Sequence, residues 1–172
     1  YFGALGLGFL LVEIPLIQRF ILFLGHPTLA LAAVLAGILF WSGLGSLLAP
    51  RLPWRAALLA LLAVLIAYQF LLRPSFDLAL GSPLSVRLPF ALLLLAPLGL
   101  LMGMPFPWGL RWLSAAAPRL TTWAWAINGC TSVIASVLAA LLALQFGFSA
   151  VLLLGAGSYA LAAVMVIDFA QD

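Results

Sequence analysis

The chain has 172 residues, of which 67% are hydrophobic and only 6% are charged, with a net charge of +3. A soluble domain is usually about half apolar and about a quarter charged, and a chain of this length cannot hide so much apolar surface in one core. The composition therefore predicts an integral membrane protein embedded in the lipid bilayer. Nucleic-acid binding is not expected, because the arginines are scattered singly instead of forming a basic face.

The apolar runs predict an all-α polytopic bundle of about six transmembrane helices, because a spanning helix needs roughly 20 apolar residues. In chain order the predicted spans cover residues 1–25, 28–48, 54–72, 89–113, 122–146 and 149–168 of one transmembrane domain. The chain begins at Tyr1 within an apolar run and lacks the basic stretch of a signal peptide. We expect it to be a fragment of a longer protein.

The first span contains Glu13 near its middle, where a charged side chain costs a few kcal/mol and is expected to face protein or water. Pro15 follows and removes the hydrogen bond to the carbonyl of Leu11. An acid beside a broken helix is typical of an ion or substrate site. The alternative is a structural role, in which Glu13 pairs with Arg19 or with another helix, and in which Gln18 and Arg19 lie nearer the membrane surface.

His26 is the only histidine, and it lies in the sequence Gly25-His26-Pro27 after the first span. A histidine in a membrane helix can ligate haem or the magnesium of a chlorophyll, but this position favours a turn residue near the membrane surface. The single cysteine, Cys130, lies within an apolar run. Because the sequence has no Cys/His cluster, no metal site and no cofactor are predicted.

The arginines predict the orientation of the bundle. The connections after the second and fourth spans share one side and carry Arg51, Arg55, Arg111 and Arg119, whereas the opposite side carries Arg73 and Arg87. Cytoplasmic loops are enriched in Arg and Lys. We therefore expect the first side, and with it both chain ends, to be cytoplasmic.

The fourth span is interrupted by Pro105 and Pro107 and carries Gly99 and Gly103 four residues apart. Small residues at this spacing allow another helix to approach closely. The prolines free backbone carbonyls that need new partners from neighbours or water. A static kink is favoured here, and a hinge or a cavity wall is the alternative.

The fifth span carries a stripe of small and polar residues, headed by Asn128, at helical spacing. Its members are Asn128, Ser132, Ala135, Ser136 and Ala139. This pattern favours tight helix packing, and Asn128 is also placed to meet Glu13 across the bundle.

A short sequence pattern occurs in both the first and the fourth span. Both contain proline, three residues, arginine and an aromatic residue, beginning at Pro15 and at Pro107. Three spans separate the two copies, which is consistent with a weak 3+3 inverted repeat like those of transporters.

Four segments of the sequence, residues 1–28, 42–46, 103–111 and 125–129, resemble the membrane region of large bacterial spermidine synthase-like proteins. The resemblance implies a location in the bacterial cytoplasmic membrane and an upstream cytoplasmic domain with aminopropyltransferase-like or methyltransferase-like chemistry. The motifs of that catalytic domain have no counterpart here, so no functional residue can be transferred.

We therefore expect a non-catalytic membrane domain that serves as an anchor or packs with other membrane subunits. One alternative is a transporter-like module for a polyamine or another small cation that uses Glu13. Another is a pigment-associated or haem-associated subunit that uses His26. A membrane-anchored enzyme would require catalytic chemistry upstream of Tyr1.

Overall fold

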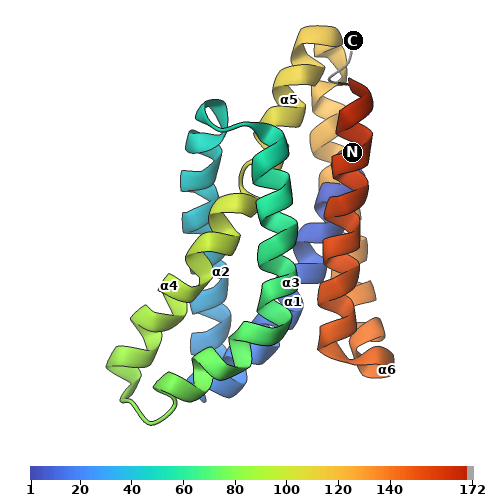
Figure 1. The fold of residues 1–172 in the computed structure, drawn as a ribbon. Helices are drawn as coiled ribbons and strands as arrows, with labels where there is room; N and C mark the ends of the chain where they lie inside the picture. The colour runs from blue at the N-terminus through green and yellow to red at the C-terminus, as the bar shows by residue number, and fades with distance from the viewer. Residues whose placement is uncertain (170–172) are drawn as a thin grey trace.

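The computed structural model describes the backbone of residues 1–169 and the side chains of residues 1–166, and these residues are almost entirely helical. Figure 1 shows the arrangement of the helices. The elements are α1 (Phe2–Leu24), α2 (Pro27–Leu48), η1 (Ala49–Arg51), α3 (Trp54–Ala79), α4 (Leu84–Met102), α5 (Pro105–Ala116), η2 (Pro118–Leu120) and α6 (Thr121–Phe169). Five helical segments are long and apolar enough to cross a membrane.

Helix α6 is a folded-back pair, although its 49 residues form one helical element. A straight helix of that length would extend about 74 Å, far beyond the roughly 30 Å of a bilayer core. The backbone turns at Gly147, whose φ of 80° and ψ of 162° suit glycine. The first half (121–146) and the second half (148–169) then run antiparallel (Figure 1). The turn falls between the predicted spans 122–146 and 149–168.

The predicted span 89–113 is divided in the structure. Helix α4 begins earlier, at Leu84, and ends at Met102, and α5 begins at Pro105. Pro105 lacks a backbone N–H and so cannot continue the hydrogen bonding of α4, although Met104 before it keeps helical φ and ψ. The second proline, Pro107, is accommodated within the first turn of α5, where its missing donor costs little.

Helix α3 is longer than the predicted span 54–72, because it continues through Pro74 to Ala79. The extension carries Phe76, whose ring stacks on Phe23 with a centroid distance of 4.5 Å and meets Phe20 edge-on at 5.0 Å. This aromatic packing compensates for the hydrogen bond that the proline removes.

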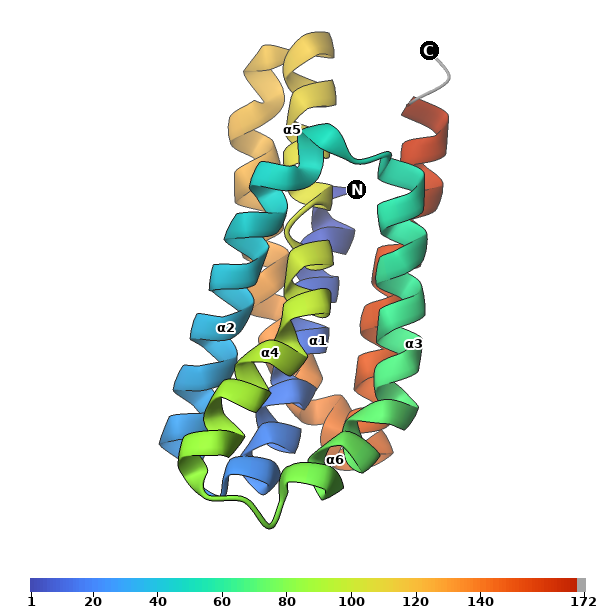
Figure 2. The same ribbon diagram turned by 60° about the vertical axis from the view of Figure 1, so that its left-hand side comes forward.

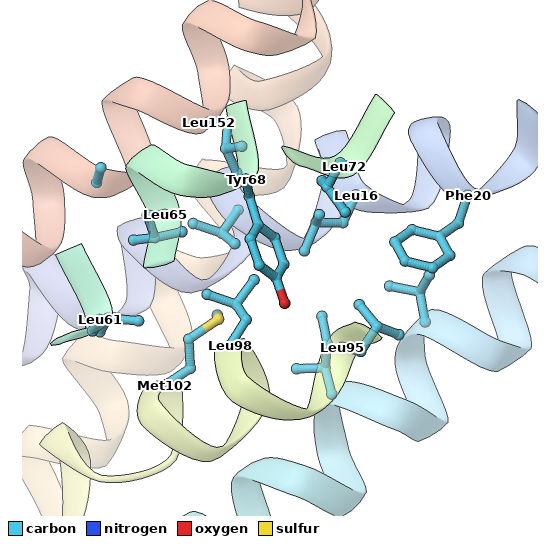
Figure 3. Packing of buried hydrophobic residues seen from close by; sticks show 14 of the residues in the cluster. Leu16, Phe20, Leu61, Leu65, Tyr68, Leu72, Leu95, Leu98, Met102 and Leu152 are labelled. Atoms are coloured by element: carbon cyan, nitrogen blue, oxygen red, sulfur yellow. The ribbon is translucent and has the colours of Figure 1, made fainter. Parts of the chain in front are cut away.

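Helix α1 lies at the centre of the bundle and packs against α2, α4 and both halves of α6. Close to it, side chains from α1, α2, α3, α4 and α6 form one apolar cluster (Figure 3). The N-terminus, the end of α6 at Phe169, and the α2–α3 and α5–α6 connections lie at one end of the bundle, called the terminal end here (Figure 2). The α1–α2 and α3–α4 connections and the turn of α6 lie at the opposite end.

Helices α2 and α4 approach closely through glycines on both partners. A Cβ added at Gly103 would collide with the backbone of Ser42, and one added at Gly45 would collide with the carbonyl of Leu100. A Cβ at Gly99 would lie 2.7 Å from that of Trp41. The predicted close-approach face of Gly99 and Gly103 is therefore confirmed, and α2 is its partner.

Two neighbouring helices donate hydrogen bonds to the backbone of α4 on the N-terminal side of Pro97. The indole Nε1 of Trp41 in α2 donates to the carbonyl of Leu92 over 2.9 Å. The hydroxyl of Tyr68 in α3 donates to the carbonyl of Leu94. Pro97 frees the carbonyl of Leu93, and these two hydrogen bonds hold the backbone on either side of that carbonyl to α2 and α3.

Candidate functional site: a cleft between α2 and α6

Glu13 is the one charged side chain that is buried within the described residues, with 5% of its surface exposed. It lies on α1, which is continuous from Phe2 to Leu24 with Pro15 inside it. The predicted irregularity at Pro15 is therefore a missing backbone hydrogen bond and not a break in the helix. Within the described part of the chain, the Glu13 carboxylate has no hydrogen-bond or ion-pair partner.

Arg19 does not pair with Glu13, so this predicted structural role is not realised. Its guanidinium donates to the carbonyl of Tyr68 over 3.2 Å and to Gln69 Oε1 and Ser149 Oγ over 3.0 Å each. The Gln69 amide in turn donates to the carbonyl of Ser149 over 2.9 Å. This Arg19 node joins α1, α3 and α6 just beyond the turn of α6. The neighbouring Gln18 is exposed.

Asn128 has a packing role between α1 and the first half of α6, and it does not bond to Glu13. Its Nδ2 donates to the carbonyl of Phe2 over 3.1 Å, and Ser132 Oγ donates to the carbonyl of Gly6 over 3.3 Å. A Cβ at Gly6 would collide with the backbone carbonyl of Asn128. The polar stripe thus packs against a glycine of α1, as the sequence indicates.

His26 is exposed and precedes α2 in the α1–α2 turn, in the extended conformation of an N-cap residue. This agrees with the turn position that the sequence favours. Within the searched residues, no group of three or more His, Cys, Asp or Glu side chains converges as a metal site would require. Cys130 is exposed on α6.

A cleft of about 650 Å³ lies between α2 and the first half of α6. Leu5, Phe9 and Leu10 of α1 line it, together with Gly103 and Pro107 at the α4–α5 break. The interrupted fourth span therefore forms a cavity wall. The polar side chains along the cleft are Ser42, Ser46, Asn128, Ser132 and Tyr159.

Tyr159, on the second half of α6, is the most deeply buried polar side chain of the cleft, with 2% of its surface exposed. Its ring packs against α1, where a Cβ at Gly8 would lie 3.0 Å from it. Within the described residues no hydrogen bond reaches its hydroxyl, in contrast to the hydroxyls of Tyr1 and Tyr68, which both donate to backbone carbonyls. The sequence does not single out Tyr159, because a lone tyrosine among small residues resembles an ordinary packing residue.

Glu13 lies next to the cleft along α1. It follows Phe9 by four residues and Leu10 by three, and residues at these spacings share a helix face. The structure thus places Asn128 and Tyr159 in the lining of the cleft and Glu13 beside it on α1, whereas Arg19 and His26 belong to other parts of the bundle.

Comparison of the chain with protein-family models, with curated proteins and with solved structures finds no match. The resemblance to spermidine synthase-like membrane regions therefore stays a prediction from the sequence.

Proposed function

We propose that this chain is a non-catalytic integral membrane domain that anchors, or packs within, a larger membrane assembly of the bacterial spermidine synthase-like type. The observation that carries the proposal is the use of the polar side chains to join helices. Trp108 Nε1 donates to the carbonyl of Ala49 over 2.8 Å, and Arg87 donates to the carbonyl of Phe23 over 2.8 Å. Trp41, Tyr68 and Asn128 likewise donate to the backbone of another helix.

Such bonds hold a bundle together in lipid. The carbonyls of the last turn of a helix have no partner within that helix, and Arg87 donates to one of them, that of Phe23 in α1. Its positive charge also opposes the negative end of the α1 dipole. Polar groups committed in this way support a scaffold role.

The proposed topology has six membrane crossings, with the two halves of α6 as the fifth and sixth. The terminal end is the proposed cytoplasmic side, since cytoplasmic loops are enriched in arginine. The arginines of the terminal end are Arg51, Arg55, Arg111 and Arg119, and those nearer the opposite end are Arg19, Arg73 and Arg87.

Cysteine labelling tests this topology in a Cys130→Ala background. In intact cells, Ser82→Cys and Gln145→Cys are both expected to react with a membrane-impermeant maleimide, because both lie at the periplasmic end. Ser114→Cys should react only after the membrane is permeabilised. Labelling of Ser114→Cys in intact cells would reverse the orientation, and a Gln145→Cys that stays unreactive in every condition would contradict a turn at the membrane surface.

Native mass spectrometry of the full-length protein, extracted from its own membrane in mild detergent, tests the assembly. We expect this membrane domain to be recovered either with a covalently attached cytoplasmic domain or with another membrane subunit. Recovery as a lone bundle, with neither attachment, would contradict the anchor function.

A second candidate function is a transporter-like module for a polyamine or another small cation. Buried Glu13, without a partner among the described residues, favours it, because an ionisable group inside a membrane commonly marks a substrate or ion path. In proteoliposomes, Glu13→Gln should abolish the uptake of labelled spermidine. Asp77→Asn makes the same chemical change at an exposed site and should leave uptake intact. Absence of uptake by the wild-type protein, or full uptake by Glu13→Gln, would refute this candidate.

A further inference from the structure

The cleft between α2 and α6 is open toward the surface that faces lipid. Helix α2 packs mainly on α4 and α1, and α6 packs mainly on α1 and α3, so α1 separates the two walls. The cleft is lined by the exposed side chains of Leu39 on α2 and Trp125 on α6, with 61% and 59% of their surfaces accessible. A molecule dissolved in the bilayer therefore reaches the cleft sideways, between these two side chains.

The inner part of the cleft offers hydrogen-bonding groups that the fold leaves unused. The Tyr159 hydroxyl can both donate and accept, and no described residue bonds to it. The Asn128 side chain uses Nδ2 in its bond to Phe2, which leaves its amide oxygen as an acceptor. Tyr159 is almost fully buried and Asn128 is half-buried, and both line the cleft. A ligand in the cleft can therefore complete the hydrogen bonds of these two groups.

The remaining lining is apolar, and the cleft volume of about 650 Å³ falls within the range of ligand pockets. Small-molecule sites commonly combine such an apolar lining with a few polar groups that orient the ligand. Here the acceptors are near α1, and the apolar side chains extend toward the lipid.

We propose that this cleft binds a single-chain amphiphile from the bilayer, with a head group that carries a hydrogen-bond donor. The head bonds to the Asn128 amide oxygen and the Tyr159 hydroxyl, and the hydrocarbon chain lies between α2 and α6. A hydroxyl or an amine supplies the donor, and Glu13, which follows Phe9 of the cleft lining by one helical turn on α1, is the acidic group that an ammonium head would approach. This site does not depend on the anchor function or on transport.

Quenching of tryptophan fluorescence tests the site, because Trp125 lines the cleft. The protein is reconstituted in phosphatidylcholine nanodiscs and titrated with a bromine-labelled C18 alcohol, the matching amine and the matching alkane. We expect saturable quenching by the alcohol or the amine, above the linear background that the alkane produces. Trp125→Phe should remove the saturable component.

Two variants connect that signal to the cleft. Gly43→Leu should abolish saturable quenching, because Gly43 lines the cleft and a side chain added there meets open space instead of the fold. Gly157→Leu is the matched control, since Gly157 is equally open but lies outside the cleft, and it should bind as the wild type does. Tyr159→Phe, which loses only the hydroxyl, should weaken binding by about tenfold.

The two head groups give distinguishable results. If the alcohol and the amine bind equally, and Glu13→Gln changes neither affinity, the head group binds as a neutral hydrogen-bond donor. If the amine binds more tightly than the alcohol, and Glu13→Gln removes this difference, the head group is an ammonium. Quenching that stays linear for both probes, or that is identical in the wild type and Gly43→Leu, would overturn the proposal. Circular dichroism of every variant confirms that it is folded.

Discussion

Replacing Gly45 by leucine is expected to separate α2 from α4 and to cost about 3 kcal/mol or more of stability. A Cβ at Gly45 would overlap the carbonyl of Leu100, and a backbone group cannot rotate away as a side chain can. The helices must therefore move apart and lose the contacts around Gly103. Unfolding in mixed micelles of mild detergent and dodecyl sulfate, followed by circular dichroism, measures the loss as a lower unfolding midpoint.

Gly43→Leu is the control for this prediction, because Gly43 lies two residues earlier on the same helix and a Cβ there meets nothing within 4 Å. Its stability should stay within about 0.5 kcal/mol of the wild type. Gly103→Ala should reproduce the large loss from the other helix, since its Cβ would meet the backbone of Ser42. Equal midpoints for Gly43→Leu and Gly45→Leu would show that the close approach is not a source of stability.

Replacing Arg19 by methionine is expected to loosen the turn of α6 and to cost about 3 kcal/mol, because hydrogen bonds to a charged group are worth about 1.5–3 kcal/mol each and are not additive. The Arg19 node is what joins α1 to α3 and to Ser149 just after the turn. Methionine keeps the apolar length of the side chain and removes the donors. The unfolding midpoint should fall, and hydrogen exchange of the backbone amides around Gly147 should become faster.

Arg111→Met provides the comparison, because it makes the same substitution at an exposed arginine of α5. It should change stability by less than about 0.5 kcal/mol and leave exchange at the turn unchanged. If Arg19→Met and Arg111→Met lowered the midpoint equally, loss of positive charge would explain the effect, and the Arg19 node would have no specific role.

Patterns that are local in the chain predict much of the fold. The apolar runs indicate the helices, Gly147 falls at the boundary between two of them, and the spacing of Gly99 and Gly103 indicates a surface for close approach. Pro105 indicates an irregularity. It does not by itself distinguish a kinked helix from two separate ones, because that outcome depends on whether neighbours satisfy the freed backbone.

Contacts between distant parts of the chain could not be predicted. Arg19 bonds to Gln69 and Ser149, which lie 50 and 130 residues away in sequence. The spacing within α1 left Glu13 as an alternative partner for Arg19. Helical periodicity shows which residues share a face, but it does not show which other helix packs against that face. The role of Tyr159 could not be predicted for a related reason. Its burial follows from packing against Gly8 of α1, which is distant in sequence, and not from its sequence neighbours.

The central position of α1 has a consequence for biogenesis. This helix is synthesised before α6, yet the first half of α6 covers Gly6 and the second half covers Gly8, on two different sides of α1. During translation α1 therefore enters the membrane before its final partners are made. It contacts lipid or the insertion machinery until the two halves of α6 are synthesised. A nascent chain that stops after α5 leaves both sides of α1 uncovered and lacks the hydrogen bonds that Asn128 and Ser132 donate to the α1 backbone.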